Sequence, residues 1–549
     1  MKTTSVLEHS VSSGVRVAVG RIALAGICLV LAACGGRTDT PPPAGAVSQT
    51  VAPTITQQPA SVSVTAGQAA VFSVAASGTA PLAYQWRRNG VDIAGANVTT
   101  YTIGAAALPD SGALFQIVVT NAAGSATSNA AALSVMANAA AIGTQQFGTP
   151  AEDLAYGIAT DAQGNFYTAG VTAGSLDGTT TASVAGALFV VKYDKSGVRQ
   201  WIRQLGTTNG DTRAVGVAID PVGNVYAAGS TSGDLDGNSN AGMVGNFDLF
   251  VVKYDSSGVK QWTRQLGTPG DDFANGIAAD AQGNVYVTGT TSGGLDGNSN
   301  AGLSGDDVFI VKYDGAGTRQ WTRQFGAAGD DEGVGIAIDA QGNVYVAGST
   351  RDGVLDGNIN AGGFDLFIVK YDAAGTRQWT REFGTAAHDR ATGIAADAQG
   401  NVYVSGHTQG NLDGNTNAGS EDLFIVKYDA AGTRQWTRQL GTPGDDYATG
   451  IAADAQGNVY VSVNTQGNLD GNANAGGFDS FIVKYDGAGI KQWTREFGTT
   501  ADDHATGIAT DAQGNVYVTG FTGGGLDGNT NAGLDDFFVV KYDSAGVKQ

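Results

Sequence analysis

The stretch GIAADAQGNVYVTG at residues 276–289 carries the pattern that decides the fold. Its Gly-Asn pair, followed by Val or Phe and then Tyr, occurs seven times. The asparagines are Asn165, Asn224, Asn284, Asn343, Asn401, Asn458 and Asn515. Successive copies are 57 to 60 residues apart. A near-constant period of this length indicates one structural unit repeated seven times.

Each repeat predicts four short strands. In one copy, segments rich in β-branched and aromatic residues lie at 261–267, 276–280, 284–287 and 308–314, separated by Gly, Asn, Asp and Ser. No stretch between them has a helical period, so the pattern indicates antiparallel strands joined by tight turns. Radial repetition of four-stranded units makes a β-propeller, with each unit as one blade. We therefore expect an all-β ring of seven four-stranded blades.

Side-chain size predicts the order of strands within a blade. The segment Gly276–Asp280 has the smallest side chains, so we expect it innermost, where blades converge and space is scarcest. The Trp-bearing segment is then outermost. Its tryptophans are expected to pack between blades, with carbohydrate stacking as the alternative role. They are Trp201, Trp262, Trp321, Trp379, Trp436 and Trp493.

The two ends of the repeat region complement each other. The sequence stops at Val547-Lys548-Gln549, where a seventh Trp-type strand would begin, while residues 144–149 match residues 263–268. We expect the N-terminal copy to pair beside residues 539–543 and to close the ring. The alternative is a sequence truncated at its C-terminus.

The order of these motifs resembles a known family. A GNVYVTG segment followed by a D-x-FIVKYD segment is similar to the seven-bladed β-propeller repeats (SBBP-type) of bacterial surface proteins, over residues 142–549. The resemblance implies the fold but no single activity, because propellers host many functions.

Residues 53–135 lack the long period and resemble an immunoglobulin-like domain. Trp86 corresponds to the buried tryptophan of that β-sandwich. The usual disulfide positions hold Val74 and Ile117, and the usual corner tyrosine is Phe115, so the resemblance implies a sandwich held by packing without a bridge. We expect this domain to be a spacer, with a protein- or glycan-binding module as the alternative.

The N-terminus predicts export. Arg16 and Arg21 precede the apolar run 22–33, which is too short to span a bilayer and fits a signal peptide over residues 1–33. The run ends at Leu-Ala-Ala-Cys, which resembles the bacterial lipobox, so Cys34 is the expected lipidation site. Ordinary cleavage nearby is the alternative. Residues 34–52 contain three prolines and predict a flexible tether. By analogy with the family, the residue after Cys34, a glycine, favours the outer membrane, with the protein facing the periplasm or the cell surface.

Charge and cysteine content argue against several kinds of binding partner and site. The net charge is −21 and the estimated pI is 4.4, which argues against binding nucleic acid or anionic lipid directly. The two cysteines, Cys28 and Cys34, lie in the first 34 residues, so neither a disulfide framework nor a cysteine zinc site is expected in the mature body.

A recurrent Asp-Gly-Asn loop between the second and third strands is the first candidate site. Hard cations such as calcium bind carboxylate and amide oxygens, which this loop supplies together with a later aspartate. The alternative is that these side chains only satisfy loop backbone. The candidate ligands are Asp236, Asn238, Asn240 and Asp248 in one copy and Asp296, Asn298, Asn300 and Asp307 in the next.

A ring of aspartates is the second candidate. Each stands four residues before the glycine that opens the inner strand, so a closed ring would gather them near one mouth of the channel. They are Asp153, Asp272, Asp331, Asp389, Asp446 and Asp503, and His388 and His504 flank the ring. Clustered like charges favour a bound cation, raised pKa values or a cationic partner. A solvated rim is the alternative.

The repetition itself argues against catalysis, because most polar residues recur six or seven times and no nucleophile or phosphate-loop motif is present. We therefore expect a monomeric, membrane-anchored lipoprotein that acts as a non-enzymatic binding or scaffold module for a protein or glycan. The alternatives are a secreted hydrolase or lyase with a site at the channel mouth, and a calcium-stabilised structural surface protein.

Overall fold

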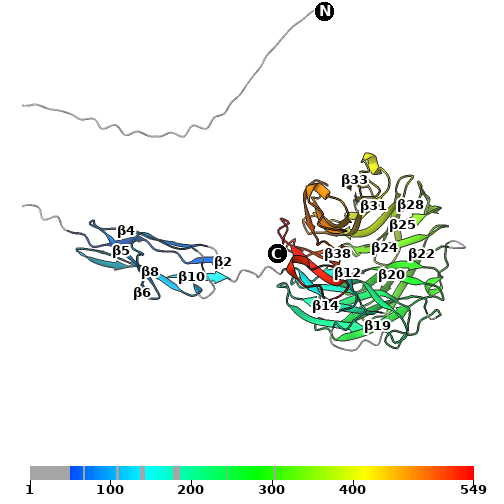
Figure 1. The fold of residues 1–549 in the computed structure, drawn as a ribbon, viewed down its shortest axis with the longest axis horizontal. Helices are drawn as coiled ribbons and strands as arrows, with labels where there is room; N and C mark the ends of the chain where they lie inside the picture. The colour runs from blue at the N-terminus through cyan, green and yellow to red at the C-terminus, as the bar shows by residue number, and fades with distance from the viewer. Residues whose placement is uncertain are drawn as a thin grey trace, which may run out of the picture. The chain divides into compact units, whose positions relative to one another are not determined.

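The computed structural model describes residues 50–65, 69–104, 106, 110–136, 143–176, 186–243, 245–301 and 305–549. The chain divides into two compact units, one ending at Ser134 and the other beginning at Val135 (Figure 1). Both are built from β-strands, as the sequence predicts. The predicted signal peptide, Cys34 and most of the tether lie outside the described residues. Within the described residues, no helix is long and apolar enough to cross a membrane.

The first unit holds ten strands. A sheet runs in the order β2-β10-β8-β5-β6 with β9 beside β8, and β1 pairs with β4 and β3 with β7. The strands are β1 Thr54–Gln57, β2 Val62–Thr65, β3 Ala70–Ser73, β4 Ala75–Ser77, β5 Ala83–Arg88, β6 Val91–Asp92, β7 Thr100–Ile103, β8 Leu114–Asn121, β9 Gly124–Thr127 and β10 Ala131–Met136.

The core of this unit is aromatic. Trp86 is fully buried, and the rings of Phe72 and Phe115 stack with centroids 4.5 Å apart. Val74 and Ile117 are buried too, so apolar packing occupies the positions where a bridged relative would hold its disulfide.

The second unit is a ring of seven four-stranded sheets, called blades one to seven. Blade one is β12 Asp153–Thr160, β13 Phe166–Thr172, β14 Ala187–Tyr193 and β15 Arg199–Leu205. Blade two is β16 Thr212–Ile219, β17 Val225–Thr231, β18 Asp248–Tyr254 and β19 Lys260–Leu266. Blade three is β20 Asp272–Ala279, β21 Val285–Thr291, β22 Asp307–Tyr313 and β23 Arg319–Phe325.

The remaining blades follow the same order. Blade four is β24 Asp331–Ile338, β25 Val344–Arg351, β28 Phe364–Tyr371 and β29 Arg377–Phe383, with a small hairpin of β26 Val354–Leu355 and β27 Asn358–Ile359. Blade five is β30 Asp389–Ala396, β31 Val402–Thr408, β32 Asp422–Tyr428 and β33 Arg434–Leu440. Blade six is β34 Asp446–Ala453, β35 Val459–Thr465, β36 Asp479–Tyr485 and β37 Lys491–Phe497. Blade seven is β38 Asp503–Thr510, β39 Val516–Thr522, β40 Asp536–Tyr542 and β11 Gln145–Phe147.

The predicted strand order is confirmed. The first strands of neighbouring blades contact one another around the ring, and β12 contacts β38 to close it. A narrow channel of about 170 Å³ is lined by a glycine and an Ile or Val from each blade. The glycines are needed there: a Cβ on Gly157 would come within 2.6 Å of the Gly216 Cα atom.

Apolar side chains fill the space between blades. One cluster joins Tyr167 and Leu188 of blade one to Phe250 and Val252 of blade two, all fully buried. Burial of one such side chain contributes about 1.5–3 kcal/mol. The outer tryptophans join these clusters as expected: Trp262 packs against the core shared by blades two and three.

The Gly-Asn motif closes the turn between the first two strands. Gly283 has a φ of 80°, and Asn284 donates its backbone N–H to Asp280 Oδ1 at 2.8 Å. The Tyr286 hydroxyl donates to Asp280 Oδ2 at 3.0 Å. Each repeat therefore uses Asp, Gly, Asn and Tyr as one hydrogen-bonded unit, which explains why these four residue types recur together.

The N-terminal strand closes the last blade as predicted, but it pairs with residues 537–539 and not with residues 539–543. β11 pairs antiparallel with β40, and Gln146 lies opposite Phe538. Gln146 also accepts a hydrogen bond from the Leu526 N–H at 3.0 Å and donates to the Gly524 carbonyl at 2.9 Å. Blade seven thus takes its outer strand from the start of the repeat region.

Candidate functional site

The aspartates predicted to ring the channel mouth begin the inner strands at that end of the propeller, but their side chains are buried between blades. Each is the first residue of its inner strand and has a fully buried side chain, so none of the six presents a carboxylate to a partner. In blade three, Asp272 Oδ2 accepts hydrogen bonds from the Thr268 N–H at 2.5 Å and the Thr268 hydroxyl at 3.0 Å. This correction applies to Asp153, Asp272, Asp331, Asp389, Asp446 and Asp503.

Most of these carboxylates face another one across a blade boundary. Asp331 of blade four lies beside Asp307 of blade three, and both are at most 1% exposed. Burial, together with Asp307 and Asp330, raises the pKa of Asp331 to about 6. Between blades one and two the pair is absent, because Thr212 and Ala187 occupy the two positions. The acids are therefore part of the frame between blades.

The predicted calcium ligands point to separate partners. Asp236 accepts hydrogen bonds from Lys260 at 2.5 Å and from Thr263 at 2.6 Å, at the outer rim. Asp248 instead accepts from the Ala241 N–H at 2.9 Å and from Gln265 at 3.0 Å. Asn238 donates to the Leu235 carbonyl at 2.8 Å.

The third blade repeats this division. Asp296 pairs with Arg319 at 2.5 Å, and Asp307 accepts from the Ala301 N–H at 2.9 Å. Asn298 and Asn300 donate to loop carbonyls. Across the described residues, no group of three or more His, Cys, Asp or Glu side chains is arranged to hold a metal ion. Calcium binding stays a prediction, and the observed contacts favour the backbone-satisfying alternative.

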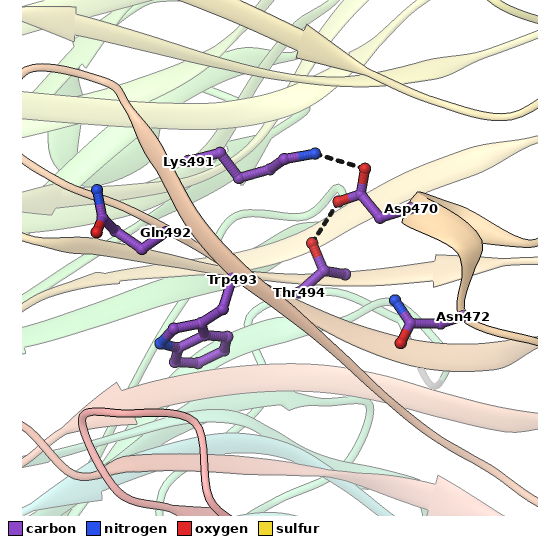
Figure 2. Close-up of a pocket in the computed structure, with 6 residues that line it drawn as sticks. All are labelled: Asp470, Asn472, Lys491, Gln492, Trp493 and Thr494. Carbon is purple, nitrogen blue, oxygen red and sulfur yellow. Dashed lines mark hydrogen bonds and ion pairs between the residues drawn. The ribbon is translucent and has the colours of Figure 1, made fainter.

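The same contacts of the loop aspartate occur at the outer rim of blade six, where they line a shallow pocket of about 400 Å³ (Figure 2). Asp470 points toward Lys491 and Thr494, accepting from each at 2.5 Å. The ring of Trp493 packs against Gly546 of blade seven, where an added Cβ would meet it at 3.0 Å. Arg495 lies 5.3 Å from the ring centroid. Because equivalent contacts recur around the rim, this pocket is part of the repeated frame.

The residues that vary lie directly after the buried aspartates. On β20, the inner strand of blade three, buried and exposed side chains alternate. Asp272 and Ala274 are buried, and Phe273 and Asn275 are exposed. Phe273 is 38% exposed, and its position holds a different side chain in most blades. We call this set the variable ring: Leu154, Arg213, Phe273, Glu332, Arg390, Tyr447 and His504.

Members of the variable ring meet across blade boundaries. Arg390 pairs with Glu332 of the preceding blade at 3.2 Å. Leu154 and Arg213 line one pocket of about 100 Å³ together with Glu152 and Tyr156. These contacts place the ring around the end of the channel at which the inner strands begin.

Carboxylates outside the variable ring make the same end of the propeller acidic. Burial and the neighbouring Asp330, Asp271 and Glu332 raise the pKa of Asp306. Burial and the neighbouring Glu152 raise the pKa of Asp535. A cationic group bound here would relieve this repulsion.

Three histidines lie at this end. His388 precedes Asp389 and accepts a hydrogen bond from the Phe364 N–H through Nδ1 at 3.1 Å. His504 belongs to the variable ring and lies against Phe478 and Phe521. His407 lies 3.7 Å from Glu421 and edge-on to Tyr447, and burial lowers its pKa. This last cluster lies at the boundary between blades five and six.

The variable ring could have been found from the sequence. Aligning the seven copies shows Ala or Gly directly after the ring position, while the ring position itself changes from Leu to Arg, Phe, Glu, Tyr and His. A position that diverges inside an otherwise uniform repeat is a candidate for a surface that the packing between blades does not determine.

Comparison with known proteins identifies both units. Residues 53–135 match the Immunoglobulin I-set domain. Six segments match the Beta-propeller repeat family, SBBP, at residues 200–236, 261–296, 320–353, 378–413, 435–470 and 492–527. The chain therefore carries an I-set domain followed by SBBP beta-propeller repeats.

Two curated relatives are similar to the chain over part of its length. Regulatory protein FlaEY of Caulobacter vibrioides is 27% identical over 363 residues, which cover 58% of this chain and 37% of that protein. An uncharacterized WD repeat-containing protein of Acanthamoeba polyphaga mimivirus is 24% identical over 437 residues, covering 62% and 31%. The match thus spans about a third of each relative. A solved Quinonprotein alcohol dehydrogenase-like protein from Bacteroides thetaiotaomicron is 14% identical, covers 81% of this chain and 96% of its own, and has a TM-score of 0.32.

Proposed function

We propose that this protein is a non-enzymatic binding or scaffold module of the cell envelope, and that it binds a protein or glycan through the variable ring. The observation that supports the proposal most strongly is the contrast within each inner strand. The buried positions keep Asp and Ala in most blades, whereas the exposed or half-buried position between them carries Arg, Phe, Tyr, His or Glu in six of the seven blades. Aromatic and Arg side chains are the types most enriched in binding hot spots.

A binding experiment tests this assignment. Soluble protein covering residues 53–549 would be presented to envelope proteins and to a glycan array, with and without calcium. We expect the combined variant Arg213→Ala, Phe273→Ala and Tyr447→Ala to lose at least about tenfold in affinity, since each hot-spot residue contributes more than about 1 kcal/mol.

A matched rim variant controls for general surface effects. Gln261→Ala and Gln492→Ala alter exposed positions on the outer strands and should leave binding unchanged. If the rim variant lost binding and the ring variant kept it, the variable ring would be excluded as the ligand surface.

The anchoring part of the proposal rests on the lipobox-like sequence before Cys34. A diacylated cysteine holds a protein at a membrane surface without a spanning helix. We expect the native chain to fractionate with outer membranes and Cys34→Ser to appear in the soluble fraction. Equal fractionation of the two would contradict the anchor.

A second candidate function, a hydrolase or lyase, is favoured by the single cluster of His407, Glu421 and Tyr447. A buried histidine beside a carboxylate has the chemistry of a general base. His407→Ala should abolish turnover of any substrate found at the channel mouth. Under the binding proposal it should weaken affinity only modestly.

A further inference from the structure

A glutamine on the outer strand secures the loop between the second and third strands. In blade two, Gln265 Oε1 accepts a hydrogen bond from the Leu235 N–H at 3.0 Å. Its amide group donates to the Gly233 carbonyl at 3.1 Å and to Asp248 Oδ2 at 3.0 Å. We call this arrangement the glutamine clasp. It recurs with Gln324, Gln439 and Gln146 in blades three, five and seven.

Blades four and six carry glutamate at the clasp position. Glu382 lies opposite Phe367 and Glu496 opposite Phe481, in the same register as Gln265 opposite Phe250. Both carboxylate oxygens of Glu382 are buried and lack a hydrogen-bond partner among the described residues.

An ionised glutamate cannot replace the amide, because it has no hydrogen to donate and stands among other acids. The groups facing Glu382 are Asp365 and Asp331. Asp365 in turn faces Asp389 of blade five. The Oδ1 atom of Asp365 and the Oδ2 atom of Asp389 both lie next to Gly384.

Glu496 stands in the same kind of acidic setting, but its carboxyl group shares a hydrogen bond with Asp479. It faces Asp479 and Asp503, with Lys548 as the cation nearby. The pKa of each glutamate is raised to about 7. Burial is the largest cause, and the neighbouring aspartates add to it.

A protonated carboxyl group restores part of what the amide supplies, with one hydrogen-bond donor in place of the two that Gln265 uses. It has one O–H donor, which can reach the neighbouring aspartate, and one carbonyl acceptor for a loop N–H. We propose that Glu382 and Glu496 act as proton-dependent clasps, which hold the loops 351–363 and 466–477 when protonated and release them when the proton is lost to solvent. These loops lie at the same end of the propeller as the variable ring. The inference concerns the propeller itself and holds whether or not that ring binds a ligand.

The direction of the pH effect follows from the raised pKa. A carboxyl whose pKa is higher in the folded state contributes its full stability below its ordinary value, and loses it as pH rises through the folded value. The two loops should therefore be best protected in mild acid and should loosen as pH rises through about 7.

Hydrogen exchange of the full chain, followed by mass spectrometry at about pH 5.5 and about pH 8, tests the proposal. The blade-five loop 409–420, clasped by Gln439, is an internal reference that cancels the intrinsic pH dependence of exchange. Relative to it, protection of the loops in blades four and six should fall about tenfold, because the protonated fraction changes about tenfold per pH unit above the pKa.

Two sets of substitutions distinguish a proton-dependent role of the glutamates from a purely structural one. The double variant Glu382→Gln, Glu496→Gln should make the protection ratio independent of pH. The reverse change, Gln439→Glu, should install the pH dependence in blade five. Asp352→Asn, whose side chain is 78% exposed, is the matched control and should change nothing.

Three results would overturn the proposal. The first is a protection ratio in the native protein that does not change with pH. The second is a double variant that keeps the pH dependence. The third is full restoration of protection at pH 8 by added calcium, which would assign these carboxylates to a cation instead of a proton.

Discussion

The two sides of an inner strand of the propeller differ sharply in how much they vary. On β20, Asp272 and Ala274 are buried and recur in nearly every blade, whereas Phe273 and Asn275 are exposed and change from blade to blade. A buried side chain must fit neighbours on both sides of the blade boundary, so few residue types are allowed. An exposed one is free to diverge. The contrast shows that different residue types at this end of the channel leave the packing between blades unchanged.

The largest effect is expected from the buried side. Phe309 is fully buried in the cluster shared by blades two and three. Phe309→Ala should lower the free energy of unfolding by about 3–5 kcal/mol, because it removes apolar contact and leaves a cavity. Urea unfolding of the variant measures this. A loss below about 1 kcal/mol would show that the buried side tolerates change as well as the exposed side does.

A backbone contact on the same side gives the next largest effect. A Cβ on Gly289 would lie 1.8 Å from the Phe273 carbonyl oxygen, and a backbone oxygen cannot move aside without distorting the sheet. We expect Gly289→Ala to cost about 1–3 kcal/mol. Thermal unfolding compares it with Gly297→Ala, where an added Cβ meets no atom within 4 Å. Because Gly297 has a φ of 81°, its variant isolates the cost of backbone conformation.

The buried acids give a smaller, pH-dependent effect. Since the pKa of Asp331 is raised to about 6, its contribution to stability is complete below about pH 4 and is lost as pH rises through 6. Asparagine imitates the protonated form. Asp331→Asn should therefore show less loss of stability between pH 4 and pH 7 than the native protein, by on the order of 1–2 kcal/mol. Chemical unfolding over this pH range measures the difference, and parallel curves would contradict it.

The exposed side should give the smallest change. Phe273→Ser should lower the free energy of unfolding by about 1 kcal/mol or less, because the ring is 38% exposed and gives up its contact with Phe247. The same variant should weaken ligand binding if the variable ring is the binding surface. Equal losses of stability from Phe273→Ser and Phe309→Ala would erase the distinction between the two sides.

The architecture could be predicted from the sequence because the repeats share one period and one order of strands. The inner position of the Gly276 segment and the pairing of Gln146 with β40 follow from side-chain size and from the missing strand. The direction of the Asp272 side chain could not be predicted. The ladder shifts register between Ala274 and Gly276, so alternation cannot be counted back through this bulge. The acids consequently face the blade boundary, and Phe273 takes the exposed position.

The pairing of β11 with β40 also determines when the protein can finish folding. Gln146 and Asp536 are 390 residues apart, yet they share a hydrogen bond in blade seven. During synthesis, β11 is made before every other strand of the propeller. It stays unpaired with β40 until the last blade has been made. The entropy of closing so long a loop grows only with the logarithm of its length, so the delay is mainly one of time. Until then the unfinished ring exposes an open blade edge, a surface on which strands of other molecules could pair.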